Sequence, residues 1–191
     1  SGVDVEKFNV ATFPKGSINF LCIARLKGDK GLRQYAAAAK IVKNKFPTVI
    51  FNLVGPEETS PDAISLDEVS SWSDYINYKG TTTDVRPLIK DAHVFILPSY
   101  HEGLPRSTLE AMSMGRAVIT TDASGCKETV KNGNNGFIVP VASIDMLVEK
   151  MIWFIEHSEQ IEPMGIESRR MVVEKFDVHK VNAKMLDIIA L

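Results

Sequence analysis

The segment His101–Asp122, HEGLPRSTLEAMSMGRAVITTD, combines two carboxylates with a glycine and a proline where a predicted strand gives way to a helix. Gly103 would let the backbone approach a ligand closely, and Pro105 suits the first turn of a helix, where its missing N–H costs little. The amides that follow are then free to face an anion such as phosphate. In that arrangement Glu102 could lie beside a sugar, and Glu110 could accept hydrogen bonds from ribose hydroxyls.

Two cations follow the first predicted strand. Arg25 stands at the end of that strand, and Lys30 stands at the start of the helix behind it. Cations and helix N-termini both stabilise phosphate charge, so this pair suits a diphosphate. The alternative is that each residue is a solvated surface cation, because turns after strands often carry such residues. The spacing alone does not separate the two interpretations.

Glu110 also has a purely structural interpretation. Residues 107–110 (STLE) fit the S/T-x-x-E capping box, in which the glutamate bonds back to the N-cap amide. Pro105 argues instead for an earlier start of the helix. The separation of the two glutamates is weak evidence by itself, since Glu159 and Glu167 repeat it with no loop around them.

Short apolar runs alternate with helical patterns along the chain. The predicted strands are Ile18–Ala24, Val49–Val54, Tyr75–Tyr78, Val94–Leu97, Ala117–Thr120 and Gly136–Val139. The predicted helices are Gly31–Phe46, Asp84–Asp91, Pro105–Met114 and most of the chain from Ser143, with a break near Pro163–Gly165. Strands separated by crossover helices predict an α/β fold with a Rossmann-like, doubly wound parallel sheet and helices on both faces.

The distinctive polar residues collect where predicted strands end. Arg25, residues 55–57 (GPE), residues 98–105 and residues 121–125 each follow a strand. Ligands of doubly wound folds bind outside the carboxyl ends of the strands, so these residues should share one rim. Residues 59–74 are rich in Ser and Asp and predict a mobile surface excursion.

The composition excludes several classes of protein. A chain of 191 residues with 45% hydrophobic and 24% charged residues indicates one ordinary globular domain. The net charge of -2 gives no reason to expect nucleic acid, and no apolar run approaches the roughly 18 residues of a membrane span. There is no G-x-G-x-x-G fingerprint and no P-loop, which argues against dinucleotide oxidoreductases and P-loop NTPases.

Metal and redox chemistry find no support in the sequence. The four histidines share no metal-ligand spacing, and there is no D-x-D element. Cys22 and Cys126 lie far apart and are interpreted as free thiols in a reducing compartment. We therefore expect no metal and no other cofactor at the site.

Several motifs occur together between Asp91 and Pro140. They are the E-x7-E element from Glu102 to Glu110, EGLP, LEAM-S-x-G, a following strand, G-x-x-E-x-V and N-G-F-x-V. This run closely resembles the donor-binding domain of retaining glycosyltransferases of the large GT4 group, which have the two-domain GT-B architecture. The resemblance extends back to ARLKGDKG, VGPE and the opening GVD, so it covers nearly the whole chain.

The resemblance implies a role for each candidate residue. Arg25 and Lys30 would bind the donor diphosphate, Glu102 would face the donor sugar, and Glu110 would bind ribose. The intervening loop would meet sugar and phosphate through Gly103, Leu104, Pro105 and Arg106. Transfer in this family is thought to proceed on one face of the sugar, with the departing diphosphate assisting removal of the acceptor proton. The candidate catalytic residues Glu102, Arg25 and Lys30 would then position the donor and stabilise charge.

The resemblance also predicts the domain organisation. Residues 1–191 correspond to the nucleotide-sugar-binding domain, and the acceptor-binding N-terminal domain that precedes GVD in this family is absent. Residues 176–191 would cross back to that domain in relatives. The alternative is a last helix packed on its own sheet.

We therefore expect transfer of a hexosyl unit from a nucleotide sugar, a UDP-sugar, to a saccharide or lipid-linked saccharide. The isolated domain should be inactive. Two alternatives stay open, namely a UDP-sugar epimerase of the same architecture and a nucleotide-sugar-binding module without activity. The expected location is the cytoplasm, at the inner face of the plasma membrane for the full-length protein.

Overall fold

A parallel sheet of six strands forms the centre of the molecule. The structure is a computed structural model that describes residues 2–190. The strand order is β3-β2-β1-β4-β5-β6, and every neighbouring pair is parallel. The strands are β1 Asn19–Ile23, β2 Ile50–Val54, β3 Asn77–Tyr78, β4 Val94–Leu97, β5 Ala117–Thr121 and β6 Gly136–Val139. The helices are α1 Leu32–Lys45, α2 Leu66–Ser70, α3 Arg86–Asp91, α4 Arg106–Ser113, α5 Ile144–Glu156, α6 Ile161–Lys175 and α7 Val178–Ile189.

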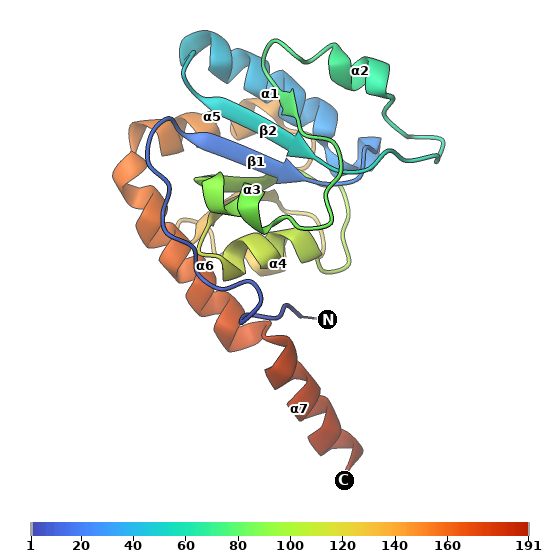
Figure 1. Ribbon diagram of the computed structural model, residues 1–191, viewed down its shortest axis with the longest axis vertical. Helices are drawn as coiled ribbons and strands as arrows, with labels where there is room; N and C mark the ends of the chain where they lie inside the picture. The colour runs from blue at the N-terminus through green and yellow to red at the C-terminus, as the bar shows by residue number, and fades with distance from the viewer. Residues whose placement is uncertain (1, 191) are drawn as a thin grey trace.

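Helices cover both faces of this sheet (Figure 1). Helices α1 and α5 pack together on one face, and α4 and α6 pack together on the other. An apolar core lies on each face of the sheet, the first under α1 and α5 and the second under α4 and α6. Phe20 and Cys22 of β1 point into the first core, and Leu21 points into the second. A continuously apolar strand is expected where both faces are covered. The predicted Rossmann-like, doubly wound sheet is confirmed.

The start of α1 depends on Gly31. Its φ of +71° is left-handed, and a Cβ there would lie 1.9 Å from the carbonyl oxygen of Pro98. Only glycine fits a backbone conformation and a contact of this kind without strain. The 3-10 turn η1, Gly28–Lys30, is thereby held directly against the end of β4.

The predicted helix break near Pro163–Gly165 is wrong. The chain turns at η3, Ser158–Gln160, and α6 runs through the proline and the glycine. Pro163 lies in the first turn of α6, where its missing N–H would have no partner within the helix. A Cβ on Gly165 would lie 2.1 Å from the carbonyl oxygen of Gly115. This glycine therefore allows close packing of α6 on the turn before β5.

Residues 59–74 are more ordered than the predicted mobile excursion. They include α2, whose N-cap Ser65 accepts a hydrogen bond from the Glu68 amide at 3.1 Å. Val69 and Trp72 are buried against the first core. Arg33 of α1 donates two hydrogen bonds to the Glu68 carboxylate, at 2.7 and 3.0 Å. The sequence signal was missed because the apolar residues of this short helix are sparse.

Two arginines hold the N-terminal segment, residues 3–12, against the second core. Arg116 is buried, and its guanidinium lies 3.0–3.3 Å from four carbonyl oxygens, those of Thr12, Ile89, Lys90 and Gly115. Arg169 of α6 donates to the carbonyl oxygens of Val5 and Phe8 in that segment. Burial lowers the pKa of Arg116 to about 10, so the guanidinium stays charged at neutral pH.

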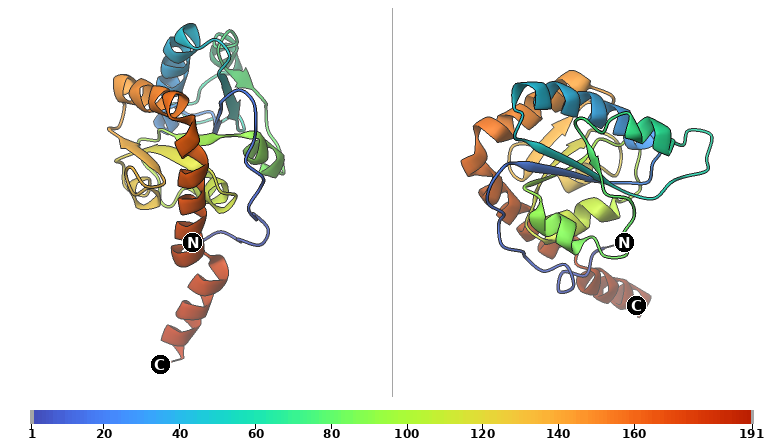
Figure 2. Two further views of the ribbon diagram at one scale, coloured as in Figure 1. Left: turned by 90° about the vertical axis from the view of Figure 1, so that its left-hand side faces the viewer. Right: turned by 45° about the horizontal axis from the view of Figure 1, so that its top comes forward.

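The last helix projects away from the sheet (Figures 1 and 2). None of the residues 178–189 is buried, and Met185, Leu186, Ile188 and Ile189 are exposed. The alternative that this helix packs on its own sheet is therefore wrong for the described residues, and Leu191 lies outside them. Among residues 2–190 we find no helix with both the length and the apolar character needed to cross a bilayer.

The start of α7 is tied to the start of the chain. The Val3 amide donates to the carbonyl oxygen of Phe176 at 2.8 Å, and the Val178 amide donates to that of Val3 at 3.0 Å. Asp177 caps α7 by accepting from the His179 amide at 3.1 Å. The two segments therefore pair as a short parallel bridge.

Candidate functional site

An open cavity of about 650 Å³ lies at the carboxyl ends of the central strands. This is the edge where doubly wound folds bind ligands. Its walls come from the ends of β1 and β4, the turn before α1, and the first turns of α4. The lining residues are Ile23, Ala24, Arg25, Lys30, Pro56, Leu97, Glu102, Pro105, Arg106, Ser107 and Glu110.

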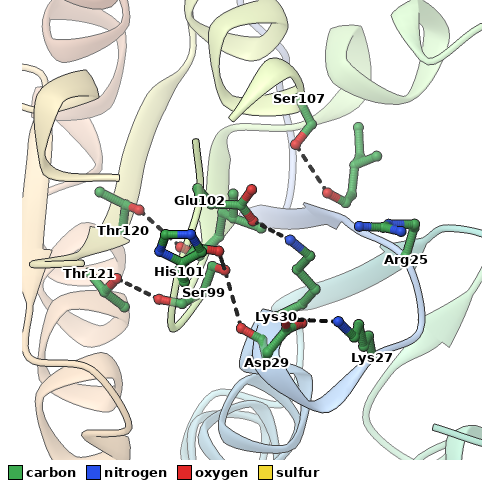
Figure 3. A network of polar contacts seen from close by, with 12 residues as sticks. Arg25, Lys27, Asp29, Lys30, Ser99, His101, Glu102, Ser107, Thr120 and Thr121 are labelled. Carbon is green, nitrogen blue, oxygen red and sulfur yellow. Dashed lines mark hydrogen bonds and ion pairs between the residues drawn. The ribbon is translucent and has the colours of Figure 1, made fainter. Parts of the chain in front are cut away.

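Lys30 and Glu102 form an ion pair in this cavity (Figure 3). The Lys30 Nζ and a Glu102 carboxylate oxygen are 2.7 Å apart, and the two side chains are only 12% and 16% exposed. Lys30 ends η1, and Glu102 lies in the loop after β4. They meet because Gly31 lets η1 approach Pro98 so closely. The pair puts one cation and one carboxylate inside a partly shielded space.

Hydroxyl groups of Ser99 and Thr121 hold the loop after β4 that carries Glu102 (Figure 3). The Ser99 hydroxyl lies 3.0 Å from the carbonyl oxygen of His101 and 3.2 Å from that of Asp29. The Thr121 hydroxyl donates to the Ser99 carbonyl at 2.6 Å. These contacts fix the loop after β4 to both η1 and the end of β5. Sequence reasoning missed these supports, although Ser and Thr at strand ends were a usable signal.

Gly125 is a further residue that the sequence reasoning did not single out. Its φ is +81°, and a Cβ there would lie 2.2 Å from the Gly103 carbonyl oxygen and 2.3 Å from that of Glu102. The loop after β5 can therefore approach the Glu102 loop only with glycine at this position. The Glu102 amide donates to the Ser124 carbonyl at 3.3 Å across this contact.

Arg25 lies at the rim of the same cavity, as the strand-end position predicts. Its side chain is 57% exposed, and its guanidinium donates to the Glu58 carboxylate at 2.9 Å. Arg25 therefore lies at the site and is also largely solvated, so both interpretations of its charge stay open. The expected diphosphate contact stays a prediction.

Glu110 is not the end of a capping box. Helix α4 begins at Arg106 after the N-cap Pro105, and the Ser107 hydroxyl instead donates to the Ile23 carbonyl at 3.1 Å. The Glu110 side chain is 8% exposed and accepts a hydrogen bond from Arg106 at 2.9 Å. Burial raises the pKa of Glu110, and the Arg106 guanidinium partly opposes this rise. A carboxylate held this way can accept hydrogen bonds from a ligand in the cavity.

The loop residues before α4 divide into two groups. Pro105 and Arg106 line the cavity, and the Arg106 side chain is 82% exposed. Gly103 and Leu104 are not among the lining residues, and Leu104 lines a neighbouring hollow instead. No described atom lies within 4 Å of the position of a Gly103 Cβ, so packing does not require glycine there. Its predicted role toward a ligand stays a prediction.

The remaining chemistry-bearing residues form no second centre. Residues 2–190 contain no cluster of three metal-ligating side chains, and Cys22 and Cys126 are free and buried. Burial raises the pKa of both thiols. A more open hollow of about 710 Å³ lies at the amino ends of the strands and includes His93. His93 is buried there and accepts a hydrogen bond from the Asn19 amide at 3.0 Å, which is a structural role.

Two comparisons with named proteins identify relatives. One is the N,N'-diacetylbacillosaminyl-diphospho-undecaprenol alpha-1,3-N-acetylgalactosaminyltransferase of Campylobacter jejuni, 33% identical over 136 residues, covering 71% of this chain and 35% of that protein. Another is the UDP-Gal:alpha-D-GlcNAc-diphosphoundecaprenol alpha-1,3-galactosyltransferase of Escherichia coli, 27% identical over 202 residues, covering 98% of this chain and 52% of that protein. The chain thus spans about half or less of these relatives.

Solved structures share the fold. HepE from Anabaena, in complex with UDP, matches with a TM-score of 0.87 and 19% identity over 99% of this chain and 56% of that one. The C-terminal domain of LpcC, a glycosyl transferase group 1 family protein from Francisella tularensis, matches with a TM-score of 0.78 and 22% identity over 93% of this chain and 100% of that one. The profile of the family described as Glycosyl transferases group 1 matches residues 17–157, which is most of the chain. The chain therefore belongs to this family of glycosyltransferases.

Proposed function

We propose that this chain is the donor-binding domain of a GT4-type retaining glycosyltransferase whose donor is a UDP-sugar. The observation that carries the proposal is the single cavity that gathers Lys30, Glu102, Glu110 and the N-terminus of α4. A diphosphate needs cations and free amides, a ribose needs acceptors, and a hexose needs a polar side chain beside it. The cavity supplies one group of each kind.

Each residue then has a defined task. Lys30, Arg25 and the amides at the start of α4 meet the diphosphate, and they stabilise the negative charge that grows on it as the sugar departs. Glu102 faces the donor sugar and fixes its orientation. Glu110 accepts hydrogen bonds from the ribose hydroxyls. No proton acceptor from this chain is required, because the departing diphosphate receives the acceptor proton on the same face of the sugar.

The acceptor is proposed to be a saccharide carried on a lipid diphosphate. The relatives from Campylobacter jejuni and Escherichia coli both carry a diphospho-undecaprenol acceptor in their names, which supports this class. Because the chain spans about half of such relatives or less, we propose that a second, acceptor-binding domain completes the enzyme. The reaction would then take place at the inner face of the plasma membrane. Relatives named as transferases favour transfer over epimerisation or simple binding.

A panel of nucleotides tests the donor assignment. UDP, GDP, ADP and inorganic diphosphate are titrated into the chain by calorimetry, and the same samples are assayed for transfer from UDP-sugars. We expect UDP to bind more tightly than the other nucleotides. Binding should be unchanged in EDTA, because the cations and helix N-terminus already offset the diphosphate charge. Transfer should be absent, since catalysis needs the acceptor held about 3–3.5 Å from the reacting carbon.

Three results would contradict the proposal. Loss of UDP binding in EDTA, with recovery in Mn²⁺ or Mg²⁺, would make the site metal-dependent. A tighter complex with another nucleotide would change the donor. Transfer by this chain alone, as fast as by a longer protein with an acceptor domain, would show that the acceptor site lies within residues 1–191.

Glu110→Gln tests the ribose contact. The substitution should weaken UDP about tenfold, because a hydrogen bond to a charged group contributes about 1.5–3 kcal/mol. Inorganic diphosphate has no ribose, so its affinity should not fall, and release of Arg106 from its partner can only favour it. Glu167→Gln provides the matched control, since that carboxylate pairs with Arg170 on α6, outside the cavity. Equal loss for both ligands, or a lower melting temperature with normal affinity, would make Glu110 a structural residue.

A further inference from the structure

Every cation that lines the cavity already has a carboxylate partner. Lys30 pairs with Glu102, and Arg106 pairs with Glu110. Both of these carboxylates line the cavity themselves. Arg25 differs, because its partner Glu58 comes from the loop after β2 and is not among the lining residues. Glu58 has no task in the donor site as described so far.

The loop that carries Glu58 is fastened at both ends to the Arg25–Lys30 turn. The Leu26 amide donates to the Pro56 carbonyl, and the Gly28 amide donates to the Asp62 carbonyl, both at 2.9 Å. Between these anchors, Glu57 and Thr59 are exposed, whereas the Glu58 side chain is only 21% exposed. Glu58 is therefore directed toward Arg25, and fixed anchors on both sides hold it there.

We propose that Glu58 is a positioning residue that holds Arg25 at the rim of the cavity and releases it to the donor diphosphate. The inference rests on the proposed donor site. It adds a residue, Glu58, that competes with the donor diphosphate for Arg25. The diphosphate carries more negative charge than one carboxylate, so the Arg25 guanidinium pairs with the diphosphate instead of Glu58 when the donor binds. Exposed ion pairs are weak, and release of Arg25 therefore takes little from the binding free energy.

This arrangement predicts an unusual direction of effect. Without the carboxylate charge at residue 58, the diphosphate no longer competes with Glu58 for the Arg25 guanidinium. Affinity for a diphosphate should then rise, where removal of most site residues would lower it. The Arg25 side chain is the route of this effect, so the gain must disappear when Arg25 is removed.

The experiment is a double-mutant cycle on the whole chain. Inorganic diphosphate and UDP are titrated by calorimetry into wild type, Glu58→Gln, Arg25→Ala and the double variant at low salt. Glu57→Gln is the control, because it removes the same charge one residue away, and Glu57 forms no ion pair among the described residues. Uridine serves as a ligand without phosphate.

We expect Glu58→Gln to tighten both phosphate ligands about two- to fivefold, the range of an exposed ion pair. Glu57→Gln should give a smaller gain, and uridine affinity and melting temperature should not change. In the Arg25→Ala background the two glutamine substitutions should become equivalent.

Equal affinity gains from Glu58→Gln and Glu57→Gln in wild type, or a gain that persists without Arg25, would overturn the inference. If Arg25→Ala weakens binding while Glu58→Gln does nothing, Glu58 has no such role and the donor site stands. If Arg25→Ala has no effect, the proposed diphosphate contact fails as well.

Discussion

Replacing Lys30 by alanine should weaken UDP binding about ten- to a hundredfold, since charge-assisted contacts to phosphate are worth about 1.5–3 kcal/mol. The structure adds a second reason for a large loss. Without Lys30, the Glu102 carboxylate loses its 2.7 Å partner and directs an uncompensated negative charge toward the incoming diphosphate. Calorimetric titration of UDP and inorganic diphosphate into the variant measures the effect, and both ligands should lose affinity.

Two further variants separate these contributions. Lys40→Ala removes the same charge from an exposed position on α1 and should leave affinity unchanged. Lys30→Ala with Glu102→Gln should recover part of the loss, because the repulsive carboxylate is gone. Normal UDP affinity in Lys30→Ala would return this residue to the class of surface cations. A double variant no better than the single one would remove the repulsion argument.

Replacing Arg116 by methionine should lower the free energy of unfolding by about 3–5 kcal/mol, because four carbonyl oxygens lose a charged hydrogen-bond donor, and a hydrogen bond to a charged group contributes about 1.5–3 kcal/mol. The bond to the Ile89 oxygen is buried, and the other three are partly buried. Each orphaned buried polar group costs about 1–3 kcal/mol. Urea unfolding followed by circular dichroism measures the change. The site itself should keep its UDP affinity under folding conditions.

Arg86→Met is the matched control for that experiment. Arg86 is exposed and pairs with Asp84, so the same chemical change should cost within about 0.5 kcal/mol. A loss below about 1 kcal/mol in Arg116→Met would mean that water replaces the guanidinium at these carbonyls. The N-terminal segment would then be held by its other contacts, which include the hydrogen bonds from Arg169 and the backbone bonds of Val3.

The order of strands and helices could be predicted because most of the strands are short, largely apolar runs that alternate with longer segments of helical spacing. Strands β1, β4 and β5 show this most clearly. The two elements that sequence reasoning misjudged lack such a pattern. Helix α2 is only five residues long. Pro163 looked like a helix breaker, yet the first turn of α6 accepts it.

Most of the predicted site residues line one cavity, whereas Gly103 and Leu104 do not, and the contacts among these residues could not be predicted. Lys30 and Glu102 lie 72 residues apart, and their meeting depends on the contact between Gly31 and Pro98. Nothing in a local sequence pattern indicates that contact. Glu110 is a different case, because the local sequence held both the capping-box pattern and the proline that argued for an earlier helix start, and the structure agrees with the proline. Glu58 and Gly125 were missed because both act through a second loop.

The pairing of charges around the cavity has a kinetic consequence. The three cations Arg25, Lys30 and Arg106 are matched by three carboxylates, so these six residues together contribute no net charge at the cavity. These residues then provide no long-range attraction for anions, and if the proposed donor site is correct, encounter with a donor should proceed at the ordinary diffusional rate with little dependence on salt. Selection among the phosphate compounds of a cell should then be made after contact, by how long each remains bound. A molecule that offers phosphate alone should depart quickly, and one that also engages Glu110 should stay longer.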